Sequence, residues 1–129
     1  MPKTTQLSLS LRSKPGVLAQ VARTLADAGV NITALCAGEA AGRGRIGILV
    51  NNAGKAKRAL RAAKYRASEE PAFVVRLRNK PGRLARVAEK LARARINIRS
   101  AYATTTGRGG ATIVFTVSNP AKARRLLGG

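Results

Sequence analysis

The sequence predicts an α+β protein in which one unit of strands and helices occurs twice. The first observation is a repeat: the run LRSKPGVL at residues 11–18 returns as LRNKPGRL at residues 77–84, an offset of 66 residues. The second is an alternation of apolar and polar residues before each run, and the third is a helical spacing of apolar residues after it. A repeat of this length indicates two related units rather than one large fold.

The first strand of each unit has the pattern of a half-buried strand. Leu7, Leu9 and Leu11 are apolar, and serines stand between them. Because successive side chains of a strand point to opposite faces, this alternation places the leucines on one face. Residues 73–77 repeat the pattern in the second unit.

A helix is predicted after each of these strands. Pro15 and Pro81 suit the first turn of a helix, where no N–H donor is needed, and Ser13 and Asn79 are expected to cap it. Gly29 is expected to end the first helix. The face opposite the apolar residues is polar and should be solvated; in the first unit it carries Gln20, Arg23 and Asp27.

Two further strands and a second helix follow in each unit. The predicted strands are residues 31–37 and 46–50 in the first unit and 97–103 and 111–117 in the second. Glycine-rich turns at residues 42–44 and 107–110 are expected to join them as hairpins. The second helix is predicted at residues 53–63 in the first unit and after Asn119 in the second.

Residues 65–68 predict a short fourth strand, ended by residues 69–71, and the second unit has no residues left for an equivalent strand. The order is therefore βαββαβ followed by βαββα, a ferredoxin-like arrangement with antiparallel sheets and helices on one face. We expect two domains, residues 1–70 and 71–129. The absent last strand should leave an exposed sheet edge, which invites pairing with another chain, and we therefore expect a homodimer.

Composition narrows the function classes. The chain has 25 Lys and Arg against 5 Asp and Glu, a net charge of +20, which favours an acidic partner but could also reflect the bias of the source proteome. The single cysteine, Cys36, cannot form an internal disulfide and is expected to be a small buried side chain. The sequence shows neither a long apolar run nor a secretory signal, so we expect a cytoplasmic protein.

The residues that usually carry catalysis are scarce. There is no histidine, which removes the commonest general base and metal ligand. The carboxylates of Asp27, Glu39 and Glu89 are isolated in sequence, and no basic partner can be named for Ser13 or Ser100. We therefore expect no enzymatic activity, no metal and no cofactor.

The doubled Lys-Pro-Gly turn carries the binding hypothesis. A helix N-terminus presents unpaired N–H groups, so the amides around Gly16 and Gly82 could receive a carboxylate. The carboxamides of Asn31, Asn97 and Asn79 could accept from an α-ammonium group. Together these groups suit an amino acid. The alternative is that the glycines only form the turn and the asparagines only cap or end elements.

The run at residues 78–91, continuing to Asn-Ile at 97–98, resembles an ACT domain, a small regulatory module of amino-acid metabolism, and residues 13–35 resemble another. The likeness covers about residues 5–127 and is closest to stand-alone proteins of two ACT domains. It implies an amino-acid ligand held between one module's first-helix loop and a neighbouring module. Carried over by position, it implies the ligand-binding residues Ser13, Gly16, Val17, Asn31, Asn79, Gly82 and Asn97.

The two copies depart from one another at this loop. The first has Ser13 where the second has Asn79, and Arg83 stands where the first has Val17, which predicts unequal pockets. Some amino-acid-sensing members of the family use a histidine next to this loop, where this chain has leucine. The resemblance therefore does not name the amino acid.

Two other functions remain open at this stage. The same fold carries RNA in other families, and the positive charge would suit RNA, but base stacking needs exposed aromatic rings. The chain has two Phe and two Tyr, with Phe73 and Phe115 in core-like positions and Tyr102 as the candidate platform. A third function is binding to a partner protein, such as an enzyme of amino-acid synthesis.

Overall fold

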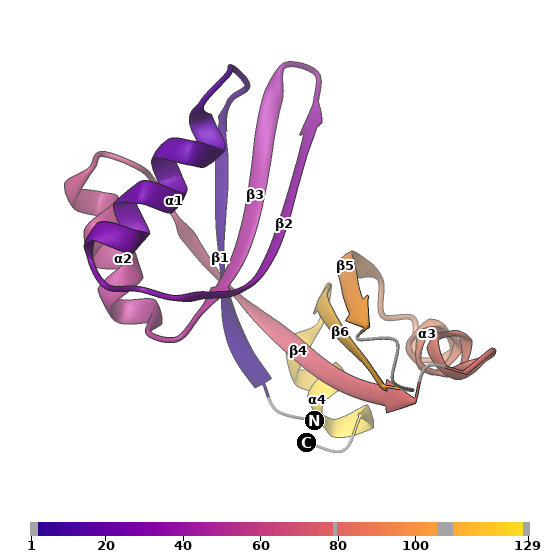
Figure 1. The fold of residues 1–129 in the computed structure, drawn as a ribbon. Helices are drawn as coiled ribbons and strands as arrows, with labels where there is room; N and C mark the ends of the chain where they lie inside the picture. The colour runs from indigo at the N-terminus through magenta and orange to yellow at the C-terminus, as the bar shows by residue number, and fades with distance from the viewer. Residues whose placement is uncertain (1–2, 79, 106–109, 128–129) are drawn as a thin grey trace. The chain divides into compact units, whose positions relative to one another are not determined.

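The computed structural model describes residues 3–78, 80–105 and 110–127. These contain six strands and four helices, in the order β1 (Lys3–Arg12), α1 (Val17–Asp27), β2 (Ile32–Ala40), β3 (Arg43–Val50), α2 (Ala53–Ala62), β4 (Ser68–Arg78), α3 (Arg83–Arg93), β5 (Ile98–Thr105), β6 (Gly110–Val117) and α4 (Pro120–Leu126) (Figure 1). The chain divides into a first unit, Thr5–Glu70, and a second unit, Pro71–Gly129 with Met1–Thr4. This is the α+β, antiparallel arrangement that the sequence predicts.

The first unit has the strand order β2-β3-β1-β4. Strand β3 pairs antiparallel with β1 on one side and with β2 on the other. Helices α1 and α2 lie side by side against these strands (Figure 1). The core between helices and strands contains the fully buried Leu7, Leu25, Ile48 and Leu60. Leu7 and Leu9 are buried, and Leu11 packs against the same core, as the alternation predicts.

The second unit repeats this plan with β5-β6-β4, again antiparallel. Its core contains Phe73 and Phe115 from the strands and Leu91 from α3. No strand follows α4 among the described residues. The place beside β4 is held by β1, whose first residues, up to Thr4, belong to this unit, so the expected open edge is not found there.

Helices α1 and α3 begin later than the sequence predicts. Pro15 and Pro81 precede the helices rather than forming their first turns, and the capping residues are Gly16 and Gly82, with φ of 90° and 88°. The amide of Val17 donates to the Lys14 carbonyl at 3.4 Å, and the second copy has the equivalent bond. Proline followed by a glycine of positive φ is the signature of a type II turn, which explains why these prolines stay outside the helix.

The predicted cap at Ser13 is wrong, because no side chain caps α1. Its counterpart Asn79 lies outside the described residues. The serine hydroxyl donates instead to a carboxylate oxygen of Glu39 on β2. A type II turn separates Ser13 from the first helical N–H groups, and this separation explains the difference.

The end of α1 is as predicted. Gly29 has a φ of 74°, and its amide donates to the Ala26 carbonyl at 2.9 Å. This is the left-handed glycine that commonly ends helices. The same place is taken by Lys64 after α2 and by Arg95 after α3, with φ of 68° and 59°. Two helices therefore end on a side chain held in a conformation that favours glycine.

Two boundaries of the first unit differ from the prediction. Strand β4 runs unbroken through residues 69–71, where the sequence predicts a break. The β2–β3 turn consists of Ala41 and Gly42, both with positive φ, so β2 continues to Ala40 and β3 begins at Arg43. Such two-residue turns match the twist of the strands that they join. Residues 107–109 of the other predicted turn lie outside the described residues.

Strand β2 is the outer strand of the first unit, and most of its side chains are exposed. Cys36, which the sequence places in the core, is exposed on this strand. The prediction is wrong because an edge strand has no neighbour to cover it beyond its own pair. In the described residues, no helix has the length and apolar character needed to cross a membrane.

Candidate functional site

The four helices differ in how they begin. The side chains of Asn52 and Asn119 accept hydrogen bonds from the amides of Lys55 and Lys122, at 3.0 and 3.1 Å, and so cap α2 and α4. Helices α1 and α3 begin at glycines, and among the described residues, which do not include Asn79, no side chain caps either helix. Because the first N–H groups of a helix have no intrahelical partner, the first turn of α1 is left with free donors and a partial positive charge.

Space is open over both glycines. A Cβ atom built on Gly16 or on Gly82 would meet nothing within 4 Å. The positive φ of both residues is one that side-chain-bearing residues rarely adopt, so glycine is favoured on backbone grounds alone. Among the described residues, no side chain therefore fills either bend.

A cavity of about 290 Å³ lies in the first unit beside the Gly16 turn. It is lined by the β1–α1 loop, the start of α1, the end of β2 and β3: Ser13, Lys14, Val17, Leu18, Ala37, Gly38, Glu39, Gly44 and Ile46. Its volume is at the lower end of the range for small-molecule sites. Most of its walls are apolar, and its charged groups come from Lys14 and Glu39.

Two hydrogen bonds fix the polar side of this cavity. The Ser13 amide donates to the Gly42 carbonyl at 3.0 Å, and the Ser13 hydroxyl donates to Glu39 Oε2. The tight β2–β3 turn brings both acceptors back to the loop that precedes α1. Glu39 is therefore held at the cavity by the same residue that begins the loop.

The structure brings together some of the predicted ligand-binding residues of the first unit. Ser13 and Val17 line the cavity, and Gly16 stands between them as the N-cap residue of α1. Asn31 lies beyond the other end of α1, where its amide donates to Asn51 Oδ1 at 3.0 Å. The 11 residues of α1 span about 16 Å, so Asn31 does not reach the Gly16 turn of its own unit.

The second unit has the same distribution. Gly82 is the N-cap residue of α3, and Asn97 lies beyond the other end of that helix. The Asn97 amide donates to the Ser118 hydroxyl at 2.9 Å, just as Asn31 donates to Asn51. Asn79 lies outside the described residues.

Sequence reasoning missed seven of the nine residues that line the cavity: Lys14, Leu18, Ala37, Gly38, Gly44, Ile46 and above all Glu39. The sequence presents Glu39 as an isolated carboxylate with no partner in view. A usable signal was present, because continuing the 66-residue offset through the second strand aligns Glu39 with Thr105 and marks a difference between the copies. The hydrogen bond to Ser13 has no sequence signal, because it joins residues 26 positions apart.

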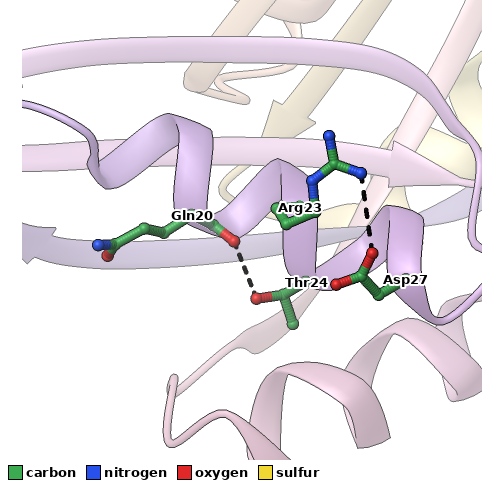
Figure 2. Close-up of polar contacts among 4 residues, drawn as sticks. All are labelled: Gln20, Arg23, Thr24 and Asp27. Carbon is green, nitrogen blue, oxygen red and sulfur yellow. Dashed lines mark hydrogen bonds and ion pairs between the residues drawn. The ribbon is translucent and has the colours of Figure 1, made fainter.

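The outer face of α1 contributes no group to the cavity. Figure 2 shows the ion pair between Arg23 and Asp27, whose Nη1 and Oδ1 atoms are 3.7 Å apart, and the Thr24 hydroxyl donating to the Gln20 carbonyl at 2.8 Å. Both charged side chains are largely exposed. This is the solvated face that the sequence predicts; the Gln20 side chain also accepts from the Tyr65 hydroxyl at 3.3 Å.

None of the four aromatic residues is fully exposed. Phe73 and Phe115 are buried, as predicted, and Tyr65 and Tyr102 are half-buried. All four lie in the described part of the chain. In that part, no group of three or more His, Cys, Asp or Glu could hold a metal ion.

Comparison with known proteins identifies the family. A family model described as an ACT domain pair matches residues 3–127. The chain belongs to the ACT domain family. ACT domains are regulatory modules, and this chain is a tandem pair of them, as the motifs predict.

Solved structures share the fold of this ACT domain pair. Protein BT0572 from Bacteroides thetaiotaomicron is 30% identical, with a TM-score of 0.88, and the match covers 97% of this chain and 86% of that one. The ligand-free regulatory subunit of aspartate kinase from Thermus thermophilus is 17% identical, with a TM-score of 0.67 and coverage of 98% and 95%. The corresponding subunit from Thermus flavus is 19% identical, with a TM-score of 0.72 and coverage of 98% and 93%. No curated protein matches the sequence.

Proposed function

We propose that this ACT domain pair is a non-enzymatic regulatory protein that binds an amino acid. The ligand carboxylate accepts hydrogen bonds from the free N–H groups in the first turn of α1, next to Gly16. The observation that carries this proposal is the uncapped start of α1, with open space over its glycine and a cavity beside it. Helix N-termini of this kind bind anions through both their N–H groups and their partial charge.

The absence of a cap is informative because the same chain caps its other helices. The side chains of Asn52 and Asn119 accept hydrogen bonds from amides in the first turns of α2 and α4, so those helices have a cap within the chain. At Gly16 the donors are left for a partner outside the chain. A reversibly bound anion would accept hydrogen bonds from these N–H groups, whereas a side-chain cap would occupy them permanently.

Regulation then follows from differential affinity. A ligand that binds one conformation of the protein more tightly than another shifts the population toward the first. The free energy that drives this shift cannot exceed the difference between the ligand's binding free energies for the two conformations. The protein acts on its partners, in this proposal, through the conformation that the amino acid stabilises.

The proposal includes a second copy of the chain as the source of the remaining ligand contacts. Asn31 and Asn97 lie at the far ends of their own helices, so they reach a Gly turn only if another module presents them. The exposed outer strand β2, with Leu35 43% exposed, and the neighbouring Leu18, 42% exposed, support a homodimer that pairs this edge. Analytical ultracentrifugation tests this point, and a monomer at all concentrations would contradict it.

The direct test is a thermal-shift screen of the purified protein against the twenty amino acids at millimolar concentration, followed by calorimetry on each hit. A ligand that binds only the folded protein raises its melting temperature in proportion to ligand excess. At least one amino acid is expected to raise it. If none does, the proposed function is wrong.

A further inference from the structure

We propose that Glu39 determines the specificity of the cavity in the first unit, by binding the ammonium group of an amino acid whose side chain is apolar. This inference rests on the proposed function and adds to it the class of ligand. It starts from an unusual placement: the chain has 25 basic residues and only 5 acidic ones, and one of those five lines the cavity beside the Gly16 turn.

The hydrogen bond at Glu39 leaves its negative charge available. Asp27 and Glu69 face cations, with N–O distances of 3.7 Å to Arg23 and 3.3 Å to Lys57. Glu39 accepts instead from the neutral hydroxyl of Ser13. A carboxylate has about four acceptor positions, so one hydroxyl orients the group without satisfying it. The bond holds Glu39 in place for a cationic partner.

The two charges of the cavity match the two ends of an amino acid. On one side the first turn of α1 carries free N–H donors and partial positive charge, and Lys14 lines the cavity next to it. On the other side stands the carboxylate of Glu39, linked through Ser13 to the same loop. An amino acid presents a carboxylate and an ammonium group on one carbon atom, so both ends can be bound within this one site.

The remaining walls select the side chain. Val17, Leu18, Ala37 and Ile46 contribute aliphatic carbon to the cavity. A polar ligand side chain placed against them would lose its hydrogen bonds to water without replacement, whereas an apolar one would gain from leaving water. The cavity therefore favours an amino acid with an aliphatic side chain.

The second copy differs at the decisive position. Strand β2 pairs Glu39 with Gly44, and β5 pairs Thr105 with Ala111, which is the equivalent register. Both pairs follow an irregularity at the same place, near Ile32 in one copy and near Ile98 in the other, so the alignment is structural as well as sequential. Threonine carries no charge, and the inference assigns recognition of the ammonium group to the first copy alone.

Calorimetry on the full chain tests this with L-leucine and two analogues that each lack one charged group. 4-Methylpentanoate keeps the carboxylate and the aliphatic chain without the ammonium, and 3-methylbutylamine keeps the ammonium without the carboxylate. The test variant is Glu39→Gln, which retains an acceptor for Ser13. The matched control is Glu69→Gln, which changes the net charge equally at a residue that does not line the cavity.

L-Leucine is expected to bind the wild-type protein at one site per chain and about 10- to 100-fold more weakly to Glu39→Gln, the effect of one lost charged hydrogen bond. Binding of 4-methylpentanoate should not change with Glu39→Gln, since this analogue has no group for residue 39. Glu69→Gln should bind L-leucine as the wild type does. Thermal melts of each variant, without ligand, confirm that the fold is retained.

The outcomes separate this inference from the proposed function. Equal L-leucine affinity in the wild type and Glu39→Gln overturns the role of Glu39, even though an amino acid still binds. Tighter binding of L-lysine, L-aspartate or L-threonine than of L-leucine overturns the apolar class in the same way. If no amino acid binds the wild type, the proposed function itself has failed.

Discussion

The two copies of the module share their backbone and differ in the side chains around it. Gly16 and Gly82 cap equivalent helices with φ of 90° and 88°, and no side chain in the described part of the chain caps either helix. The second strands carry an irregularity at the same place. By contrast, the carboxylate of Glu39 in the first copy has a threonine, Thr105, as its counterpart in the second.

The shared backbone is a property of the fold, whereas the differing side chains belong to the candidate site. The glycine turn recurs with the same backbone conformation and the same turn hydrogen bond in both copies. Some side chains that line the cavity differ between the copies, among them Val17, which corresponds to Arg83, and Glu39, which corresponds to Thr105. In the proposed function the turn supplies the anion-binding amides, whereas selectivity has to be examined copy by copy.

The largest expected effect tests whether the two cores are equivalent. Leu25 and Leu91 occupy matching positions near the ends of α1 and α3, and both are 0% exposed. Replacing either with alanine should lower the free energy of unfolding by about 2–5 kcal/mol, because a buried leucine leaves a cavity. Urea denaturation followed by circular dichroism measures this.

The controls for this comparison are Leu18→Ala and Leu84→Ala, at the matching positions where leucine is 42% and 51% exposed. These should cost about 1 kcal/mol or less, since much of the side chain is already in water. A large loss for Leu25→Ala with a small one for Leu91→Ala would show that the two cores are not equivalent.

The next effect concerns the two glycine turns. Gly16→Ala and Gly82→Ala have open space for the new methyl group, so only backbone strain opposes them. Each should lower the free energy of unfolding by about 1–2 kcal/mol, the cost of a left-handed conformation for an L-residue. Equal losses support a common backbone role, and the same urea titration provides the measurement.

Ligand binding sharpens this result. With L-leucine as the probe, Gly16→Ala should weaken binding, because the methyl group enters the space over the free N–H groups, whereas Gly82→Ala should leave it unchanged. Gly110→Ala is the stability control, since its φ is not positive and nothing lies within 4 Å of the added atom. Equal weakening by both substitutions would contradict the assignment of the site to the first copy.

The order of elements could be read from the sequence because it depends on local patterns. The alternation at Leu7 and Leu9 and the helical spacing that includes Val21 and Leu25 are direct consequences of which face is buried. Both patterns, the strand alternation and the helical spacing, occur in each of the two units. Membership of the ACT family followed from the turn, the helix and the Asn-Ile pair occurring twice.

The arrangement of the candidate site could not be predicted from the sequence, because it depends on contacts between residues that are distant in the chain. Glu39 reaches Ser13 only because the β2–β3 turn reverses the chain at Ala41 and Gly42. Asn31 and Gly16 belong to one motif in sequence, but a helix separates them in space. Proximity along the chain suggested a single site, and the length of α1 rules it out within one module.

The smallest effect concerns the ends of the two helices, where the copies differ in one residue. Gly29 follows α1, whereas Arg95 holds a left-handed φ of 59° after α3. Arg95→Gly should raise the free energy of unfolding by about 0.5–1 kcal/mol, because relief of the left-handed strain exceeds the entropy that glycine gains in the unfolded chain.

The reciprocal change in the first copy makes this prediction decisive. Gly29→Ala should lower the free energy of unfolding by a similar amount, since its φ is 74° and its new methyl group would meet only the flexible tip of Lys55, at 3.3 Å. Both values come from the urea midpoint at constant slope. If Arg95→Gly lowers stability instead, the arginine makes stabilising contacts that outweigh its backbone strain, and the helix ends of the two copies are maintained by different means.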